Sequence, residues 1–262
     1  MKIDGKTIWI TGASSGIGEA LTYALDKKNC NLIISSRNEN ELQRVRNNCT
    51  RKNEIQIIAV DLAQFDTMPD YIEKAIHAFG SIDILINNAG ISQRSLIAET
   101  DFNVYKKLIE VNYLGTVALT KALLPYFINN QKGHFVTVTS LMGKFGSPYR
   151  SGYCGAKHAL HGFFDVLRME HEKDGISVTL VCPGFVNTNV AKNALIADGS
   201  SQNLQDTATQ NGLPVAVFAK KMIRAIEKEK FETYIARREK IGVYLRFFPK
   251  LLHRVVLKST VR

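Results

Sequence analysis

The sequence predicts a single α/β domain in which helices cover both faces of a doubly wound parallel sheet. Short β-prone runs alternate with helical patterns, and strands separated by helices of about 10–15 residues are typical of βαβ units. A glycine-rich turn joins the first strand to the first helix, as in dinucleotide-binding folds. The length of 262 residues and the hydrophobic content of 45% fit one globular domain. Together these observations indicate a Rossmann-type arrangement.

The first expected strand, Thr7–Thr11, leads through the glycine-rich turn into a helix over Glu19–Lys28. Glycines let the backbone approach a pyrophosphate, and a helix N-terminus offers N–H groups and the positive end of a dipole. We therefore expect the turn to bind a dinucleotide, although its G-x-x-x-G-x-G spacing leaves a simple glycine turn as the alternative. The cofactor-binding candidates in this turn are Gly12, Ser14, Ser15, Gly16, Ile17 and Gly18.

A second strand over Asn31–Ser35 ends next to Arg37, with no acidic residue at its tip. In dinucleotide-binding folds an acid at this place bonds the ribose 2′-hydroxyl of NAD, whereas an arginine accommodates the 2′-phosphate of NADP. Arg37 therefore favours NADP(H) over NAD(H) as the cofactor. A solvated loop arginine is the alternative, and Glu39 nearby weakens the preference.

The next part of the chain continues the alternation. The expected elements are a helix over Glu41–Asn48, a strand over Ile55–Ala59, a helix over Pro69–Phe79 and a strand over Ile82–Ile86. In a parallel sheet, ligands bind beyond the carboxyl ends of the strands, where Gly12, Arg37, Asp61 and Gly90 would all lie. Asp61 is expected either to accept a hydrogen bond from the adenine amino group or to be a turn residue.

A long helix is expected over Asp101–Asn130, with Pro125 bending its far end. Asn112 lies on the apolar side of this helix, and a buried asparagine needs hydrogen-bond partners. It is therefore a structural tie or part of a polar site. After a strand over Phe135–Thr139, a further helix runs to about Lys173, and its candidate N-caps are Ser147 and Ser151.

The remaining expected elements are a strand over Ile176–Val181, a helix over Leu213–Glu227 and a strand over Glu232–Ala236. The polar stretch 189–212 is a substrate lid or plain surface, and its position beside the proposed site favours the lid. The sequence thus predicts one nucleotide-binding domain over residues 1–240, including the lid, followed by a tail over residues 241–262.

The residues best suited to chemistry lie between Ser140 and Lys157. On a helix, Tyr153 and Lys157 are i,i+4 neighbours, and the preceding strand would deliver the Ser140 hydroxyl to the same place. A tyrosine with a pKa of about 10 needs roughly 4 kcal/mol of differential stabilisation to titrate near neutral pH. Lys157, in a partly dry site beside a second positive charge, could supply it. The stretch is therefore interpreted as an acid/base centre for a substrate oxygen.

Composition and charge exclude several other classes of protein. No apolar run approaches the roughly 18 residues of a membrane-spanning helix, and the first strand begins too early for a signal peptide. Four scattered cysteines lack metal-binding spacing, so we expect reduced thiols, no metal and a cytoplasmic location. The net charge is +10, but residues 237–262 carry eight basic residues and one acidic residue. The basicity belongs to the tail, and nucleic-acid binding is not expected.

These motifs together resemble the short-chain dehydrogenase/reductase family in its compact single-domain form. The resemblance covers residues 6 to about 190, and the narrower stretches Gly133–Val136, Tyr149–Ala159 and Ala197–Ser200 are similar to the branch of members 7 and 7B. In order, the family motifs are Thr11-Gly12-x-x-x-Gly16-x-Gly18, Asp61-Leu62, Asn88-Ala89-Gly90, Asn112, Ser140, Tyr153-x-x-x-Lys157 and Pro183-Gly184-x-x-x-Thr188.

The resemblance implies a catalytic role for four residues. Tyr153 would be the general acid in carbonyl reduction and the base in alcohol oxidation, and Lys157 would bind the nicotinamide ribose and depress the pKa of Tyr153. Ser140 would hydrogen-bond the substrate oxygen, and Asn112 would hold a water that links Lys157 to solvent. The further cofactor-binding residues implied are Asp61, Leu62, Asn88, Ala89, Gly90, Tyr153, Lys157, Pro183, Gly184, Val186 and Thr188.

The family also implies the reaction and the assembly. The reaction would be hydride transfer between NADP(H) and a small-molecule carbonyl or secondary alcohol substrate. A catalytically silent nucleotide-binding scaffold or sensor is the alternative. The helices over Asn103–Asn130 and Tyr149–Lys173 would form a homodimer or homotetramer.

The tail carries basic residues at every fourth position, opposite an apolar side. A basic amphipathic helix is typical of peripheral membrane contact, which could give access to a lipophilic substrate. Pro249 interrupts the pattern, and docking on the body or on a partner subunit is an equal alternative. The repeated basic residues are Arg246, Lys250, Arg254, Lys258 and Arg262.

Overall fold

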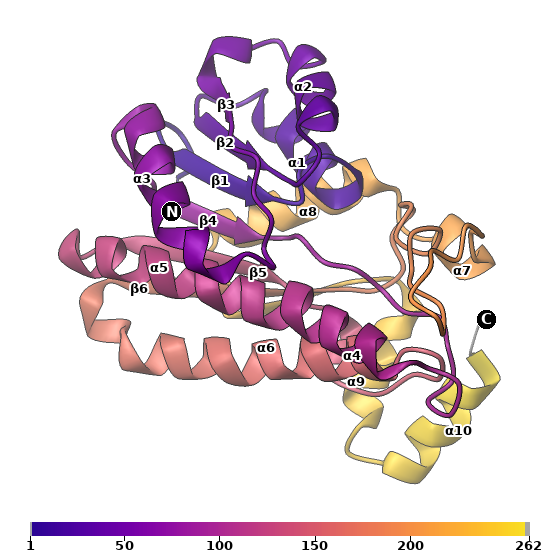
Figure 1. Ribbon diagram of the computed structural model, residues 1–262. Helices are drawn as coiled ribbons and strands as arrows, with labels where there is room; N and C mark the ends of the chain where they lie inside the picture. The colour runs from indigo at the N-terminus through magenta and orange to yellow at the C-terminus, as the bar shows by residue number, and fades with distance from the viewer. Residues whose placement is uncertain (1, 260–262) are drawn as a thin grey trace.

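The computed structural model describes residues 2–259 and contains one seven-stranded sheet (Figure 1). Its strands are β1 (Thr7–Thr11), β2 (Asn31–Ser35), β3 (Ile55–Ile57), β4 (Ile84–Asn87), β5 (Gly133–Val138), β6 (Ile176–Pro183) and β7 (Glu232–Ile235). Every neighbouring pair is parallel, in the order β3-β2-β1-β4-β5-β6-β7. The doubly wound α/β fold is confirmed, and the strand order reverses between β1 and β4.

Helices cover both faces of this sheet (Figure 1). They are α1 (Gly16–Leu25), α2 (Glu39–Asn47), α3 (Met68–Phe79), α4 (Phe102–Ile109), α5 (Gly115–Asn129), α6 (Ser151–Glu170), α7 (Thr207–Gln210), α8 (Val215–Glu227), α9 (Ile241–Leu245) and α10 (Pro249–Ser259). Expected and observed bounds differ by a few residues at most elements, because helix and strand ends depend on tertiary contacts as well as on local sequence.

Two apolar cores lie on the two faces of the sheet. One joins the sheet to α1, α2 and α8, and the other joins it to α3, α5 and α6. Trp9 of β1 is fully buried, and its indole N–H donates to the hydroxyl of Ser35 on β2 at 2.8 Å. Phe127 of α5 packs on Phe135 of β5 with ring centres 4.9 Å apart. Strands buried on both faces explain the continuous apolar runs in the sequence.

The expected long helix over 101–130 is interrupted by a π-turn, Glu110–Leu114, which separates α4 from α5. Single π-turns within α-helices are rare and occur frequently at functional sites. The turn contains Asn112, which is fully buried. The chain nevertheless stays helical from Phe102 to Asn129, close to the expected range, and the change of period at this turn was not predicted from the sequence.

The start of α6 also differs from the expectation. The helix begins at Ser151 with Arg150 at the N-cap position, so neither Ser147 nor Ser151 is the cap. Tyr149 has a left-handed backbone (φ 66°), which turns the chain into the helix. The nearby serines do not predict the N-cap correctly, because the hydrogen-bond acceptor for the first-turn N–H groups of α6 comes from a distant loop.

The expected tail divides into two parts with different packing. Val243 of α9 is buried against Leu141 and Cys182, and Gly242 lies against the ring of Phe145. By contrast, α10 has no buried residue within its described range, and Pro249 is its first residue. No helix of the described chain is long and apolar enough to cross a membrane. Arg262 lies outside the described residues.

Candidate active site

A cavity of about 1060 Å³ opens at the carboxyl ends of the strands, where the topology places ligands. The glycine-rich turn after β1 forms one end of it. Gly12 and Gly16 have left-handed backbones (φ 66° and 57°), and a Cβ on Gly12 would come within 2.8 Å of the Ala89 backbone. Only glycine fits at position 12, a left-handed backbone favours glycine at position 16, and the turn leads directly into the N-terminus of α1.

The glycine turn is held by the end of β4. The Asn88 amide donates to the carbonyls of Thr11 and Gly12 at 2.9 and 3.2 Å, and the Thr11 hydroxyl accepts from the backbone N–H of Asn88 and Ala89. Gly18 does not line the cavity. A Cβ there would lie 2.2 Å from the Gly12 carbonyl, so its role is to let α1 pack against the turn.

The cavity brings together almost all of the candidate cofactor-binding residues. Arg37 is exposed at the tip of β2 and lines the cavity together with Glu39. The Asp61 carboxylate accepts from the backbone N–H of Ala63 at 3.1 Å, as a turn residue does, and Asp61 also lines the cavity. The others on its wall are Gly12, Ser14, Ser15, Gly16, Ile17, Leu62, Asn88, Ala89, Gly90, Tyr153, Lys157, Pro183, Gly184, Val186 and Thr188.

Three of the four candidate catalytic residues line the same cavity: Ser140, Tyr153 and Lys157. Ser140 follows β5, and Tyr153 and Lys157 are one turn apart on α6. The Lys157 ammonium donates to the Val138 carbonyl at 2.9 Å and lies 5.8 Å from the centre of the Tyr153 ring. Strand and helix therefore deliver hydroxyl, phenol and ammonium to one place, as the spacing predicts.

Burial has the largest effect on the pKa values of Lys157 and Tyr153. It lowers the pKa of Lys157 to about 8, because that residue is only 4% exposed. It also raises the pKa of Tyr153, while a side-chain hydrogen bond with Ser140 and the charges of Arg94 and Arg150 act in the opposite direction. The chain itself thus places the pKa of Tyr153 above its ordinary value, opposite to the direction expected from Lys157 alone.

Asn112 lies behind the cavity wall rather than on it. Its amide accepts from the Ile91 N–H at 2.8 Å and donates to the Ile91 carbonyl at 2.9 Å, so both ends of the side chain are bonded to one backbone unit. A Cβ on Gly90 would come within 2.8 Å of its oxygen. Asn112 is therefore a structural tie that holds the segment after β4, whatever further role it has.

The stretch 189–212 contributes residues to the cavity wall and is bonded to the segment after β4. Leu195 donates to the Ser92 carbonyl at 2.9 Å and accepts from the Arg94 N–H at 2.8 Å, and Asp101 donates to Ala197 at 2.9 Å. Asn193, Leu195 and Ser201 of this stretch line the cavity. The stretch therefore forms part of the cavity wall; its action as a lid stays a prediction, and we call it the lid below.

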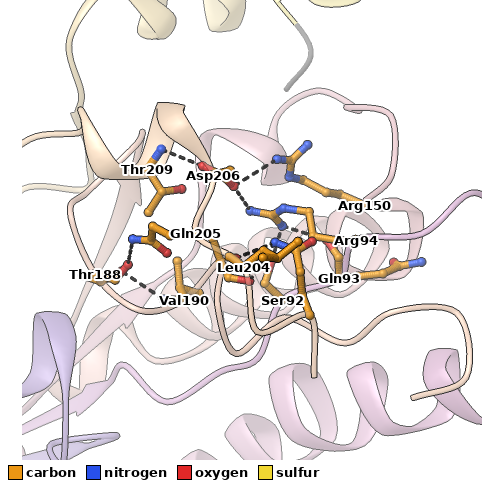
Figure 2. Close-up of polar contacts among 12 residues, drawn as sticks. Ser92, Gln93, Arg94, Arg150, Thr188, Val190, Leu204, Gln205, Asp206 and Thr209 are labelled. Carbon is orange, nitrogen blue, oxygen red and sulfur yellow. Dashed lines mark hydrogen bonds and ion pairs between the residues drawn. The ribbon is translucent and has the colours of Figure 1, made fainter. Parts of the chain in front are cut away.

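A buried ion cluster, which sequence reasoning missed, closes the lid onto the body of the protein (Figure 2). Asp206 of the lid pairs with Arg94 at 2.7 Å and with Arg150 at 3.8 Å, and its carboxylate also accepts from the Thr209 N–H at 2.7 Å. Burial opposes ionisation of Asp206, but the bonds from Thr209 and Arg94 hold its pKa below the ordinary value. Arg94 is anchored in turn by the Ser92 hydroxyl.

Two sequence signals could have indicated this cluster. Arg94 lies just beyond the carboxyl end of β4, the edge at which ligands bind in such sheets, and Arg150 precedes α6, which carries Tyr153 and Lys157. Asp206 gave no signal, because nothing in the sequence places it opposite two arginines that are 112 and 56 positions away. Only the folded chain brings the three together.

Comparison with known proteins identifies the family. The sequence profile of the short chain dehydrogenases matches residues 6–198. The human "Dehydrogenase/reductase SDR family member 7" is 45% identical over 73% of this chain, and the match spans 58% of the human protein. A "Dehydrogenase/reductase SDR family protein 7-like" from Drosophila melanogaster is 35% identical over 100% of this chain and 82% of its own length.

Solved structures show the same fold. A short chain dehydrogenase/reductase from Burkholderia phymatum, in complex with NAD, aligns over 97% of this chain and 96% of its own, with a TM-score of 0.85 and 23% identity. An alcohol dehydrogenase from Thermococcus sibiricus, complexed with 5-hydroxy-NADP, aligns over 89% of this chain and 97% of its own, with a TM-score of 0.75 and 22% identity. The glycine cradle, the seven-stranded parallel sheet and the matched profile agree: this chain belongs to the short-chain dehydrogenase/reductase family of oxidoreductases and is similar to its members 7 and 7B.

Proposed function

We propose that the protein transfers a hydride between NADP(H) and a carbonyl or secondary alcohol substrate, with Tyr153 as general acid and base. The observation that carries the proposal is that Ser140, Tyr153 and Lys157 line the same cavity as the glycine cradle. When bound, a nicotinamide supplies the hydride. The cradle fits such a group, because Gly12 and Gly16 line the cavity and the turn leads directly into the N-terminus of α1, which offers free N–H groups.

The chain's own residues would handle the proton. In reduction, the Tyr153 phenol donates its proton to the carbonyl oxygen, and in oxidation the phenolate removes the proton from the alcohol. The Ser140 hydroxyl, which is 8% exposed, hydrogen-bonds the same oxygen as charge develops on it. Lys157 is fixed to the Val138 carbonyl, and its ammonium favours the phenolate over the phenol.

The Tyr153→Phe variant tests this function. Removing the hydroxyl is expected to abolish turnover while the variant still binds NADPH, because the ring remains in place. Turnover is measured at the NADPH absorbance on a panel of ketones, steroids and fatty-acyl carbonyls, with NADH in parallel, and cofactor binding by fluorescence titration. Turnover at the wild-type rate would refute Tyr153 as the acid. Absence of turnover in the wild-type protein on every substrate would favour a nucleotide-binding scaffold.

The preference for NADP(H) is supported by the position of Arg37. It lies on the cavity wall at the tip of β2, where an arginine accommodates a 2′-phosphate. We expect Arg37→Ser to weaken NADPH binding about tenfold or more, because a charged hydrogen bond contributes about 1.5–3 kcal/mol, and to leave NADH binding unchanged. The control is Arg46→Ser, which removes the same charge from α2. Equal losses for NADPH and NADH would contradict the assignment.

Two further proposals concern assembly. Exposed apolar side chains on α6, Val166 and Met169 (46% and 70% exposed), and Leu114 in the π-turn before α5 support a homodimer or homotetramer formed through these helices. Exposed apolar residues on and beside α10 alternate with basic ones, which supports peripheral contact with an anionic membrane. These apolar residues are Phe247, Phe248, Leu251, Val255 and Leu257.

A further inference from the structure

The N-terminus of α6 lacks a capping residue of its own, although it carries Tyr153. Arginine side chains only donate hydrogen bonds, so Arg150 at the N-cap position cannot accept from the first-turn N–H groups. Those groups have no partner within the helix, and each must find one elsewhere or lose stability through burial. The geometry of the loop after β4 supplies the missing acceptor.

That acceptor is Gln93, a fully buried glutamine 59 positions away along the chain. Its side-chain oxygen accepts from the Gly152 N–H at 2.8 Å and from the Tyr153 N–H at 3.4 Å. Its amide nitrogen donates to the hydroxyls of Ser95 at 3.1 Å and Ser151 at 3.5 Å. The side-chain oxygen of Gln93 faces backbone N–H groups, which donate to it, and the nitrogen faces hydroxyls, which accept from it. These contacts fix the orientation of the amide.

Packing leaves little freedom at this contact. A Cβ on Gly152 would come within 2.8 Å of both Leu108 and Tyr105 of α4, and within 3.2 Å of the Gln93 oxygen. The Tyr105 hydroxyl lies 3.1 Å from that of Ser151, the residue that begins α6. The first turn of α6 is thus confined between α4 and Gln93, and a shift of the glutamine would move the backbone of Tyr153.

The same short segment holds the lid. Residues on either side of Gln93 bond to the lid backbone at Leu195, and the next side chain, Arg94, reaches Asp206. Figure 2 shows Arg94 directed toward Asp206, while the Gln93 side chain extends away from it. One segment therefore contacts the lid on one side and the catalytic helix on the other.

We propose that Gln93 is a positioning residue that acts through the backbone of Tyr153 and sets the phenol relative to Ser140 and the lid. The proposal rests on the proposed role of Tyr153. Displacements of about 1 Å from a productive geometry can lower a rate by about a hundredfold. Gln93 touches neither the reacting atoms nor the expected cofactor cradle, so its effect is separable from theirs.

Two substitutions test the proposal. Gln93→Met keeps the volume and removes both the acceptor and the donor, so kcat is expected to fall about ten- to a hundredfold while the Kd for NADPH stays constant. Gln93→Glu keeps the hydrogen-bond acceptor at the N-terminus of α6. Its melting temperature is expected to be close to that of the wild-type protein, and its kcat much closer to the wild-type value than that of Gln93→Met. The control is Gln56→Met, the same change at an exposed position on β3.

The pH profile separates positioning from a purely structural role. Charged or titratable groups near the Tyr153 phenol are Lys157, Arg94, Arg150 and Cys154. A carboxylate at position 93 adds a negative charge that disfavours the Tyr153 phenolate. In the plot of kcat/KM against pH for alcohol oxidation, the pH at which activity rises should therefore increase by about one unit. The measurement is kcat/KM against pH for the wild-type, Gln93→Glu and Gln56→Met proteins.

The outcomes distinguish this inference from the proposed function. The inference is supported if Gln93→Met lowers kcat and leaves the Kd for NADPH constant. If Gln93→Met does not fold, a shifted pH profile of Gln93→Glu supports it instead. The inference is overturned if folded Gln93→Met keeps the wild-type kcat, or if the pH profile of Gln93→Glu is unshifted, while Tyr153→Phe remains inactive. Full activity of Tyr153→Phe would instead overturn the proposed function, on which the inference rests.

Discussion

Tyr153 is surrounded by more positive charge than its i,i+4 neighbour provides. Arg94 and Arg150 both favour its ionised form, and the Lys157 ammonium faces its ring. The sequence predicts one of these three cations near the phenol. The other two come from the loop after β4 and from the turn before α6. Burial outweighs them in the chain itself, so the phenol is protonated at neutral pH and ready to act as an acid.

His134 of β5 gives the protein a pH-dependent stability that has no connection with catalysis. Burial lowers its pKa to about 4, and its ring accepts or shares one hydrogen bond with Thr179 at 2.8 Å. The unfolded chain keeps a histidine pKa near 6.5. Between these values the unfolded state binds more protons, so stability falls as the pH drops from about 6.5 to 4.

We expect the wild-type protein to lose about 3 kcal/mol of unfolding free energy through His134 across this window. The variant His134→Gln cannot be protonated, so its stability should decline less over the same range. Urea unfolding at several pH values between 7 and 4 measures the difference. The control is His77→Gln on the exposed side of α3, for which the slope of stability against pH should match that of the wild-type protein. Parallel profiles for all three proteins would contradict the assignment.

That the candidate catalytic and cofactor-binding residues gather at one cavity was largely predictable from the sequence, and the residues that support them were not. Gly12, Ser140 and Tyr153 follow strands or lie on a helix of strong period, so local pattern places them correctly. Gln93 and Asp206 act on residues that only the fold brings near. The pKa of Tyr153 could not be predicted either, because burial is a property of the packed structure rather than of neighbouring residues.

Among the elements, the lid is attached by backbone hydrogen bonds at Leu195 and Ala197 and by one buried carboxylate, that of Asp206. Asp206 is fully buried, pairs with Arg94 and accepts from the first turn of α7. Breaking a buried ion pair by removing one partner costs about 3–5 kcal/mol, because the other charge remains desolvated. An asparagine keeps a capping acceptor for α7 and removes only the charge. The opening of the lid should therefore be much easier in Asp206→Asn.

Trypsin measures this opening directly. Lys192 is the only lysine or arginine between residues 189 and 212, and it is exposed in a segment bonded to the rest of the lid. We expect cleavage after Lys192 to be at least tenfold faster in Asp206→Asn than in the wild-type protein. The control is Asp198→Asn, at an exposed lid residue whose carboxylate accepts from the backbone N–H of the nearby Ser200. Equal cleavage rates in the two variants would show that the ion pair does not hold the lid.

Element ends show where local signals succeed and fail. The α2 helix begins after Asn38, whose side chain accepts from the Glu41 N–H as an N-cap does. The α6 helix ignores two nearby serines because its cap comes from Gln93. The π-turn in the 101–130 region could not be predicted from helical periodicity, since the bonds from Asn112 to Ile91 that accompany it join separate elements.

The whole molecule carries its excess charge at one end of the chain. The basic residues of α10 are exposed together with its apolar ones, and each lysine or arginine near an anionic bilayer contributes about 1 kcal/mol. We expect the protein to sediment with vesicles that contain phosphatidylserine and to be released by salt. Substituting Glu at Lys250, Arg254 and Lys258 together should abolish this binding.

A matched charge reversal on the body provides the control. Replacing Lys220, Lys221 and Arg224 with Glu changes the net charge by the same amount on the exposed side of α8. That variant should still sediment with the anionic vesicles, and both variants should keep the wild-type melting temperature. If the two triple variants bind equally, α10 is not the membrane contact, and docking on a partner subunit becomes the better account of its surface.

The packing of α9 ties the order of synthesis to the completion of the site. Val243 supports Leu141, the residue next to Ser140, and Glu239 accepts from the backbone N–H of Phe185 beside the cavity. Domains fold as they leave the ribosome, N-terminal parts first. The glycine-rich turn can therefore form early on a nascent chain, whereas the segment that carries Ser140 gains the support of Val243 only after residues 239–243 have left the ribosome. A growing polypeptide of this kind acquires a place for its cofactor well before it acquires a finished catalytic centre.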